Sequence, residues 1–129
     1  MGLFCFFKKK QSSSLINTWL YEADDMYANA CEIKNPRGLD KYFIGKAMDY
    51  ILQVLNSSNR VYQGLDKYRH TTFKLLKSKG GIATYLKTVT YDNVKLSRGI
   101  KVAVGDNYEE TWSVSKVNGR VYIQTIERL

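Results

Sequence analysis

The chain has 129 residues, of which 44% are hydrophobic, and its formal net charge at pH 7 is +8. The length suits one domain with a modest core, and the composition excludes a disordered chain. No stretch approaches the roughly 18 apolar residues of a membrane-spanning helix, and two cysteines are too few for a disulfide scaffold.

Charge and cysteine content together indicate the compartment and the kind of partner. We interpret Cys5 and Cys31 as free thiols in a reducing compartment, so we expect an intracellular, cytoplasmic protein that is not secreted. The basic charge favours an acidic partner, which can be nucleic acid, an anionic membrane or an acidic protein. The alternative is a basic domain without any such partner.

The first ten residues, MGLFCFFKKK, place an apolar group before a basic one. A secretory signal has the reverse order and a longer apolar core, which argues against secretion. The segment can act as a weak membrane anchor that is peripheral to the lipid surface. Its predicted membrane contacts are Leu3, Phe4, Phe6, Phe7, Lys8, Lys9 and Lys10. The alternative is a flexible leader whose phenylalanines pack on the domain. In both interpretations, residues 1–13 precede a single α+β domain at residues 14–129.

Two helices are predicted next. Apolar residues recur at helical spacing from about Ser14 to Ile33, and Pro36 prevents the helix from continuing. Asp40 can cap a second helix that runs to about Asn56. The short break between the two helices suggests an antiparallel pair.

The stretch from Tyr68 to Tyr91 is predicted to form a long β-hairpin. Threonine and aromatic residues favour strands on both sides of Gly80-Gly81, which supplies the turn. A helix from Asp66 to Ser78 also fits the apolar spacing and is the alternative.

The last third of the chain, Arg98 to Arg128, has the pattern of a three-stranded antiparallel meander. Asn118-Gly119 predicts a two-residue type I′ turn. That turn pairs Val117 with Arg120, Val114 with Ile123, and Trp112 with Thr125.

The first strand of this meander would contain Ile100, Val102 and Val104. A three-residue loop at Gly105-Asp106-Asn107 would pair Ile100 with Trp112 and leave Glu110 on the apolar side, near Tyr108.

Glu110 is the acid with the clearest catalytic potential. Desolvation would raise the pKa of an inward carboxyl, which is how a general acid or base is poised. We prefer the interpretation of Glu110 as a residue at the sheet edge, or one paired with a helix lysine. No catalytic residue is therefore assigned.

The remaining polar residues carry weaker signals. His70 is the only histidine and is interpreted as a strand surface residue, and two scattered cysteines argue against a zinc site. Asp24 and Asp25 point about 100° apart on a helix and suggest a solvated face. Gly80-Gly81 lacks the spacing of a phosphate-binding loop. We expect no metal and no cofactor.

Basic residues gather in the predicted sheet, with one acid, Asp92, among them. They are Lys67, Arg69, Lys74, Lys77, Lys79, Lys87, Lys95, Arg98 and Lys101. Interleaved aromatic residues, Tyr68, Phe73, Tyr85 and Tyr91, could stack on single-stranded nucleic acid. The preferred interpretation is a solvated outer face of the sheet, because no RNA-binding aromatic motif is present.

The closing pattern carries a family resemblance. Glu110 and Trp112 lie in one strand, a short turn follows, and the last strand alternates as Val121-Tyr122-Ile123-Gln124-Thr125-Ile126-Glu127. Preceded by two helices, this layout resembles the nuclear transport factor 2-like superfamily, also called cystatin-like or ketosteroid-isomerase-like. Within it, the chain looks most like the domain of mitochondrial import-motor peripheral proteins and their bacterial relatives, over about Ser14 to Leu129.

The resemblance implies two helices packed on a curved antiparallel sheet around a cone-shaped pocket. Residues that would line such a pocket are Trp19, Tyr27, Tyr108, Glu110 and Trp112. Enzymes of this superfamily use an aspartate base with a tyrosine or second acid, or a His-Asp pair, and this sequence departs from both arrangements. The fold also serves adaptors and dimerisation modules, so it does not settle function.

We therefore expect a non-enzymatic binding or protein-interaction module, which pairs as a homodimer through its sheet. A small isomerase, dehydratase or cyclase that uses acid-base residues inside the cone is the alternative. A basic nucleic-acid-binding domain is the second alternative.

Overall fold

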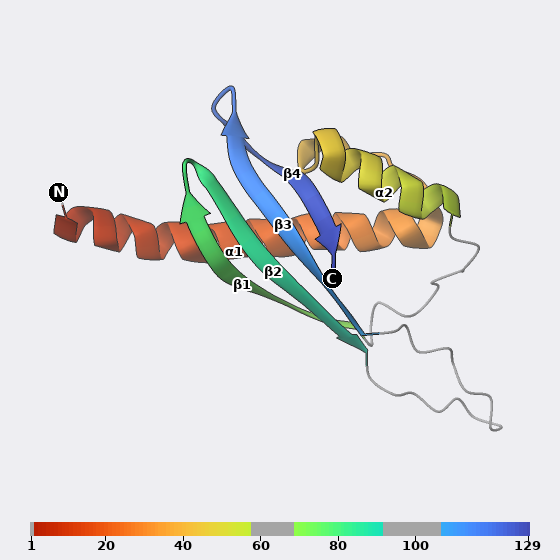
Figure 1. The fold of residues 1–129 in the computed structure, drawn as a ribbon, viewed down its shortest axis with the longest axis horizontal. Helices are drawn as coiled ribbons and strands as arrows, with labels where there is room; N and C mark the ends of the chain where they lie inside the picture. Colours follow the sequence, from red (N-terminus) through yellow and green to blue (C-terminus); the bar gives the residue numbers. More distant parts are fainter. Residues whose placement is uncertain (1, 58–68, 92–106) are drawn as a thin grey trace.

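The computed structural model describes residues 2–57, 69–91 and 107–129; of residues 2–14 and 57 it describes the backbone alone. Helix α1 (Gly2–Ile33) is followed by a 3₁₀ turn, η1 (Leu39–Lys41), and by helix α2 (Gly45–Ser57). Four strands follow, β1 (Arg69–Lys79), β2 (Ile82–Tyr91), β3 (Tyr108–Val117) and β4 (Arg120–Arg128). They form one antiparallel sheet in the order β1-β2-β3-β4. The predicted α+β class, two helices and then an antiparallel sheet, is confirmed (Figure 1).

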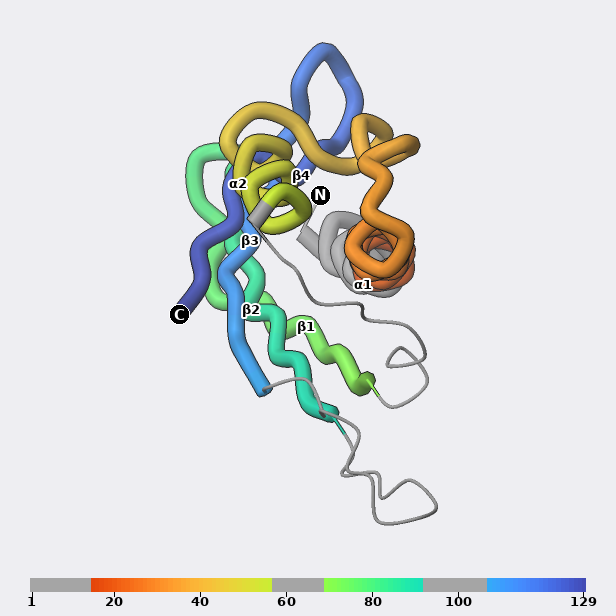
Figure 2. The backbone as a smooth tube through the Cα atoms, turned by 90° about the vertical axis from the view of Figure 1, so that its right-hand side faces the viewer, coloured from red at the N-terminus to blue at the C-terminus, as the bar shows by residue number. Residues whose placement is uncertain are grey.

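Both helices lie on the same face of the curved sheet (Figure 2). The core between them contains Leu20 and Ala23 of α1, Ile51 of α2, and Trp112 and Ile123 of the sheet, all fully buried. In the part of the chain that is described, no helix is both long enough and apolar enough to cross a bilayer.

Helix α1 is longer than predicted. It was expected to begin at Ser14, but it begins at Gly2. The segment between these residues contains neither proline nor a further glycine, so nothing in it interrupts a helix once one has formed. The predicted boundary between residues 13 and 14 therefore falls inside α1.

The predicted start of the second helix at Asp40 is wrong. Asp40 lies in η1, and α2 begins at Gly45. Between them, Phe43 forms a parallel bridge with Ile123 of β4. The Ile44 amide donates to the Ile123 carbonyl at 3.1 Å, and the Ile123 amide donates to the Tyr42 carbonyl at 2.8 Å. This long-range pairing holds residues 42–44 extended, which delays the helix.

The predicted hairpin is confirmed, and the alternative helix over Asp66 to Ser78 is wrong for its described part, which is strand. Lys79 pairs with Ile82 around Gly80 and Gly81. Both glycines have positive φ, 61° and 78°, as a type I′ turn requires.

The Asn118-Gly119 turn also forms as predicted, pairing Val117 with Arg120 and Val114 with Ile123. Beyond that point the predicted register is wrong, because Trp112 pairs with Ile126 instead of Thr125. The register shifts where Gln124 adds one residue to β4, next to the bridge with Phe43. This bulge turns Ile126 toward the core, where it is buried.

The predicted strand containing Ile100, Val102 and Val104 lies outside the described residues. The position beside β3 that it was predicted to fill belongs to β2, because Trp112 pairs with Tyr85. The predicted pairing of Ile100 with Trp112 is therefore wrong.

Candidate functional site

Among the residues that the structure describes, three charged side chains lie inside the core. Asp24 of α1, Lys87 of β2 and Glu110 of β3 are each 1% exposed or less. Burial of a charged group is costly unless the group is paired and hydrogen-bonded, so this cluster is the most unusual polar feature of the described chain.

Strand alternation explains how Lys87 and Glu110 reach the interior. Lys87 lies between Tyr85 and Val89, which are two residues away on either side and point to the same buried face. Glu110 precedes Trp112 by two residues in β3, and it pairs directly with Lys87 across the strands. Both side chains are therefore directed toward the helices.

Lys87 forms the centre of the cluster. Its Nζ lies 2.5 Å from Asp24 Oδ1 and 3.3 Å from Glu110 Oε1. The ammonium also lies over the rings of Tyr27 and Trp112, at 4.6 and 4.9 Å from their centroids. Burial lowers the pKa of Lys87, but the nearby charges, that of Asp24 first, outweigh burial and leave the pKa raised.

Glu110 receives hydrogen bonds on both carboxylate oxygens. Trp112 Nε1 and Lys87 Nζ donate to Oε1 at 3.1 and 3.3 Å. The hydroxyls of Tyr27 and Tyr50 donate to Oε2 at 3.3 and 3.2 Å. Four donors match the acceptor capacity of a carboxylate, so Glu110 is held in place by all of its lone pairs.

Both sequence interpretations of Glu110 need correction. The residue lies on a central strand instead of the sheet edge, and its lysine partner comes from β2 instead of a helix. The prediction that it sits on the apolar side near Tyr108 is confirmed, since Lys87 Nζ contacts both Tyr108 Oη, at 3.4 Å, and Glu110.

The sequence interpretation missed Lys87 and Asp24, which it placed on solvated faces. The alternation around Lys87 was a usable signal, as was the position of Asp24 one helical turn after the buried Leu20. Asp24 also accepts from Arg69 of β1, Nη1 to Oδ2 at 2.8 Å, and the two side chains form an ion pair with little exposure. Asp25 is solvated as predicted, with 82% of its side chain exposed.

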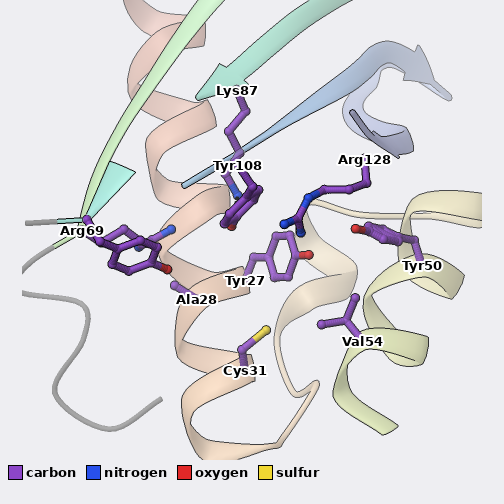
Figure 3. A pocket seen from close by; sticks show the side chains of 10 residues that line it. Tyr27, Ala28, Cys31, Tyr50, Val54, Arg69, Lys87, Tyr108 and Arg128 are labelled. Atoms are coloured by element: carbon purple, nitrogen blue, oxygen red, sulfur yellow. Dashed lines mark hydrogen bonds between the residues drawn. The ribbon is translucent and has the colours of Figure 1, made fainter. Parts of the chain in front are cut away.

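A cavity of about 100 Å³ adjoins the cluster, where side chains from both helices and all four strands converge (Figure 3). The cavity is lined by three tyrosines, Tyr27, Tyr50 and Tyr108, together with Cys31 and Arg128. Arg128 stacks on the Tyr108 ring at 4.1 Å from the centroid. Burial raises the pKa of the free Cys31 thiol to about 11.

A second and larger concavity lies between α1 and the sheet. This groove has a volume of about 850 Å³. Its lining is Leu15, Ile16, Trp19, Lys41, Leu75, Ser78, Ala83, Tyr85, Lys116, Arg120, Val121 and Tyr122. Three of these residues are cationic and none is acidic.

The residues predicted to line one pocket lie at two different places. Tyr27, Tyr108, Glu110 and Trp112 meet at the polar cluster. Trp19 instead lines the groove, where its ring lies 5.7 Å from that of Tyr42.

The groove opens at the end of the sheet that carries both turns, which we call the hairpin end and define as residues 75–82 and 115–121. The β1–β2 and β3–β4 turns lie together because Ile82 pairs with Ser115 (Figure 1). Exposed large apolar side chains gather there: Leu75, Leu76, Ile82 and Val117. Exposed basic side chains accompany them: Lys77, Lys79, Lys116 and Arg120.

Among the described residues, this end of the sheet carries no acidic side chain. Residues 69–91 and 111–126 contain neither aspartate nor glutamate, and the acids of β3 and β4 lie toward the opposite end of the sheet. His70 is exposed on β1 as predicted. The described residues bring together no group of three metal-ligating side chains.

Fold and sites together define an α+β protein with a buried ionic cluster at one end and an apolar, basic-rimmed groove at the other. No family model, curated protein or solved structure matches the chain.

Proposed function

We propose that this chain is a non-enzymatic binding module that attaches to an anionic membrane surface through its hairpin end. The observation that carries the proposal is that exposed apolar and exposed basic side chains lie together at one end of the sheet, where the described strands have no acidic residue. Apolar side chains can enter the headgroup region while lysine and arginine contact lipid phosphates.

The expected attachment is weak and reversible. Each cation near an anionic surface contributes about 1 kcal/mol, and the hairpin end offers four, Lys77, Lys79, Lys116 and Arg120. The apolar and basic residues of the first ten positions would add a second contact. Because exposed charges are screened by salt, the attachment should weaken at high ionic strength.

The same proposal includes the cone-shaped fold of the nuclear transport factor 2-like superfamily. Two helices on one face of a curved antiparallel sheet support it, as does the small cavity among Tyr27, Tyr50 and Tyr108.

The enzyme alternative is less well supported. A general base needs a lone pair that a substrate proton can reach, whereas both oxygens of Glu110 already accept from two donors each. Glu110 therefore has the surroundings of a residue that organises the core.

Nucleic-acid binding is also less well supported, because two of the aromatic side chains named for stacking, Phe73 and Tyr85, pack toward the core. Phe73 packs on Trp112, with ring centroids 5.1 Å apart, and Tyr85 is buried. The exposed lysines of β1 are therefore not interleaved with exposed rings.

Vesicle sedimentation tests the proposal. The full chain should bind vesicles of phosphatidylcholine mixed with phosphatidylserine. It should not bind vesicles of pure phosphatidylcholine in the same buffer. The double variant Lys77→Gln/Lys79→Gln should bind the mixed vesicles about 30-fold more weakly, the equivalent of two lost cations.

A matched control removes the same charge elsewhere. Lys34 and Arg37 are exposed beyond the other end of α1, and Lys34 is roughly 28 Å along the helix from Leu15. Lys34→Gln/Arg37→Gln should bind like the original chain. An equal loss in both double variants would show that net charge alone drives binding, and no binding to mixed vesicles at low salt would refute the proposal.

A further inference from the structure

We propose that the groove between α1 and the hairpin end binds one long-chain carboxylate, with the alkyl chain against the apolar lining and the carboxylate at the cationic rim. The inference rests on the proposed function for where such a ligand is met, at a membrane surface. Its binding site is distinct from the exposed tip residues Leu76 and Ile82, which do not line the groove.

The size of the groove suits a ligand with a long apolar body. Sites for small molecules commonly enclose about 300–1,000 Å³, and the groove, at about 850 Å³, lies within this range. The inner cavity beside Cys31, at about 100 Å³, is too small for such a ligand.

The cations lie along one wall of the groove. Lys116 pairs with Val121 in the sheet, and Arg120 precedes Val121. The parallel bridge between Phe43 and Ile123 brings Lys41 alongside the same part of β4. The lining residues that α1 contributes, Leu15, Ile16 and Trp19, are apolar.

This asymmetry fits a molecule with one anionic end and one apolar body. An anionic headgroup can contact Lys41, Lys116 and Arg120 without meeting any acidic lining residue. The chain can lie over Ala83 and Val121 and against Trp19, where it buries apolar surface.

An alkyl chain fits this floor better than a peptide does. The floor residues Ala83 and Tyr85 belong to β2, which is paired on both sides, with β1 and β3. Their backbone groups are engaged in the sheet and cannot satisfy the N–H and C=O groups of a bound peptide. An alkyl chain has no such groups.

Titration of the full chain with dodecanoate, followed by calorimetry and by tryptophan fluorescence, tests the inference. We expect saturable binding with one ligand per chain and a change in the emission of Trp19, which lines the groove, whereas Trp112 is fully buried. Dodecanol, which has the same chain and no charge, should bind more weakly. If dodecanol bound as tightly as dodecanoate, the cationic rim would have no role in binding the carboxylate.

Two variants address the rim and the mouth. Lys116→Gln should weaken dodecanoate binding about fivefold, the upper range for one exposed ion pair. Leu15→Glu places a negative charge at the mouth, and because Leu15 is 72% exposed, the fold should tolerate it. It should weaken carboxylate binding about as much as Lys116→Gln does, while the matched control Leu129→Glu, at a position 68% exposed and outside the groove, should leave binding unchanged.

A third variant separates this inference from the proposed function. Ala83→Phe should place a bulky ring on the floor of the groove and obstruct dodecanoate, yet it leaves every basic residue in place for vesicles. Thermal unfolding of the variant checks that it folds. If Ala83→Phe does not fold, Leu15→Glu replaces it as the variant that impairs the groove.

Each remaining outcome decides one proposal. Vesicle binding without saturable dodecanoate binding overturns the groove inference and leaves the membrane proposal standing. Saturable dodecanoate binding without vesicle binding overturns the membrane proposal and leaves the groove inference standing. An acidic amphipathic peptide that binds and is blocked by Ala83→Phe, where dodecanoate does not bind, would overturn the inference in favour of a protein partner.

Discussion

Lys87 and Glu110 face each other across β2 and β3, with Nζ and Oε1 3.3 Å apart and with only 1% of either side chain exposed. The same ammonium contacts Asp24, so one cation on the sheet links two carboxylates, one from the neighbouring strand and one from α1. Arg69 supplies a second cation to Asp24 from the edge strand. The cluster therefore joins the long helix to the sheet through desolvated ion pairs.

Replacement of Lys87 should destabilise the protein strongly. Lys87→Met keeps the length of the side chain but leaves two buried carboxylates without their shared cation. Removing one partner of a buried ion pair costs about 3–5 kcal/mol, and we expect a loss of this order in the free energy of unfolding, measured in urea. The control Lys74→Met, at an exposed position of the edge strand, should change stability little. A Lys87→Met protein as stable as the original would mean that the cluster contributes no net stability.

Stability should fall at alkaline pH. Burial is the main cause that raises the pKa of Tyr27, Tyr50 and Tyr108 above their ordinary value of 10.0, with the nearby Glu110 carboxylate adding to each. The folded protein therefore retains phenol protons that the unfolded chain releases near pH 10. This contribution to stability is complete below that pH and is lost as the pH rises through the folded-state pKa values. Urea unfolding at about pH 8, 10 and 11 should give a decreasing free energy, and a flat profile would contradict the assignment.

The Cys31 thiol should react slowly in the folded protein. The thiolate is the reactive form, and burial raises the pKa of Cys31 from 9.0 to about 11. In a Cys5→Ser background, alkylation by iodoacetamide near neutral pH should be about 100-fold slower than in urea, because two pKa units reduce the thiolate fraction by that factor. Equal rates in the folded and unfolded protein would show that Cys31 is neither buried nor shifted.

Deletion of Met1–Lys10 should leave the fold intact and weaken binding to anionic vesicles. Among the α1 side chains that the structure describes, which start at Leu15, the first that packs against the core is Ile16, beyond the deletion. The deleted segment carries three lysines, each contributing about 1 kcal/mol near an anionic surface. Circular dichroism and vesicle sedimentation measure the two effects. Unfolding of the shortened chain would place Phe4, Phe6 and Phe7 in the core, and unchanged vesicle binding would assign the whole attachment to the hairpin end.

Local patterns in the sequence were sufficient to predict the β1–β2 and β3–β4 turns and the four strands that the structure describes. Gly80-Gly81 and Asn118-Gly119 form type I′ turns because glycine and asparagine tolerate positive φ, a property of single residues. The position of Glu110 on the inner face follows from its spacing of two residues from Trp112, since side chains alternate along a strand.

The rest depended on residues that are distant in sequence. The bulge at Gln124 and the late start of α2 both follow from the bridge between Phe43 and Ile123, which no local pattern indicates. The ionic cluster has the same origin: spacing can indicate an inward direction for each charge, but Asp24, Lys87 and Glu110 come from three separate elements, and no local pattern brings them together. The sequence by itself determined the α+β class, the turns and the inward face of the last hairpin, because these depend on backbone preference and period. Only the tertiary structure decided which charges are buried, which strands are neighbours and where the groove opens, because burial and pairing are properties of contacts between elements.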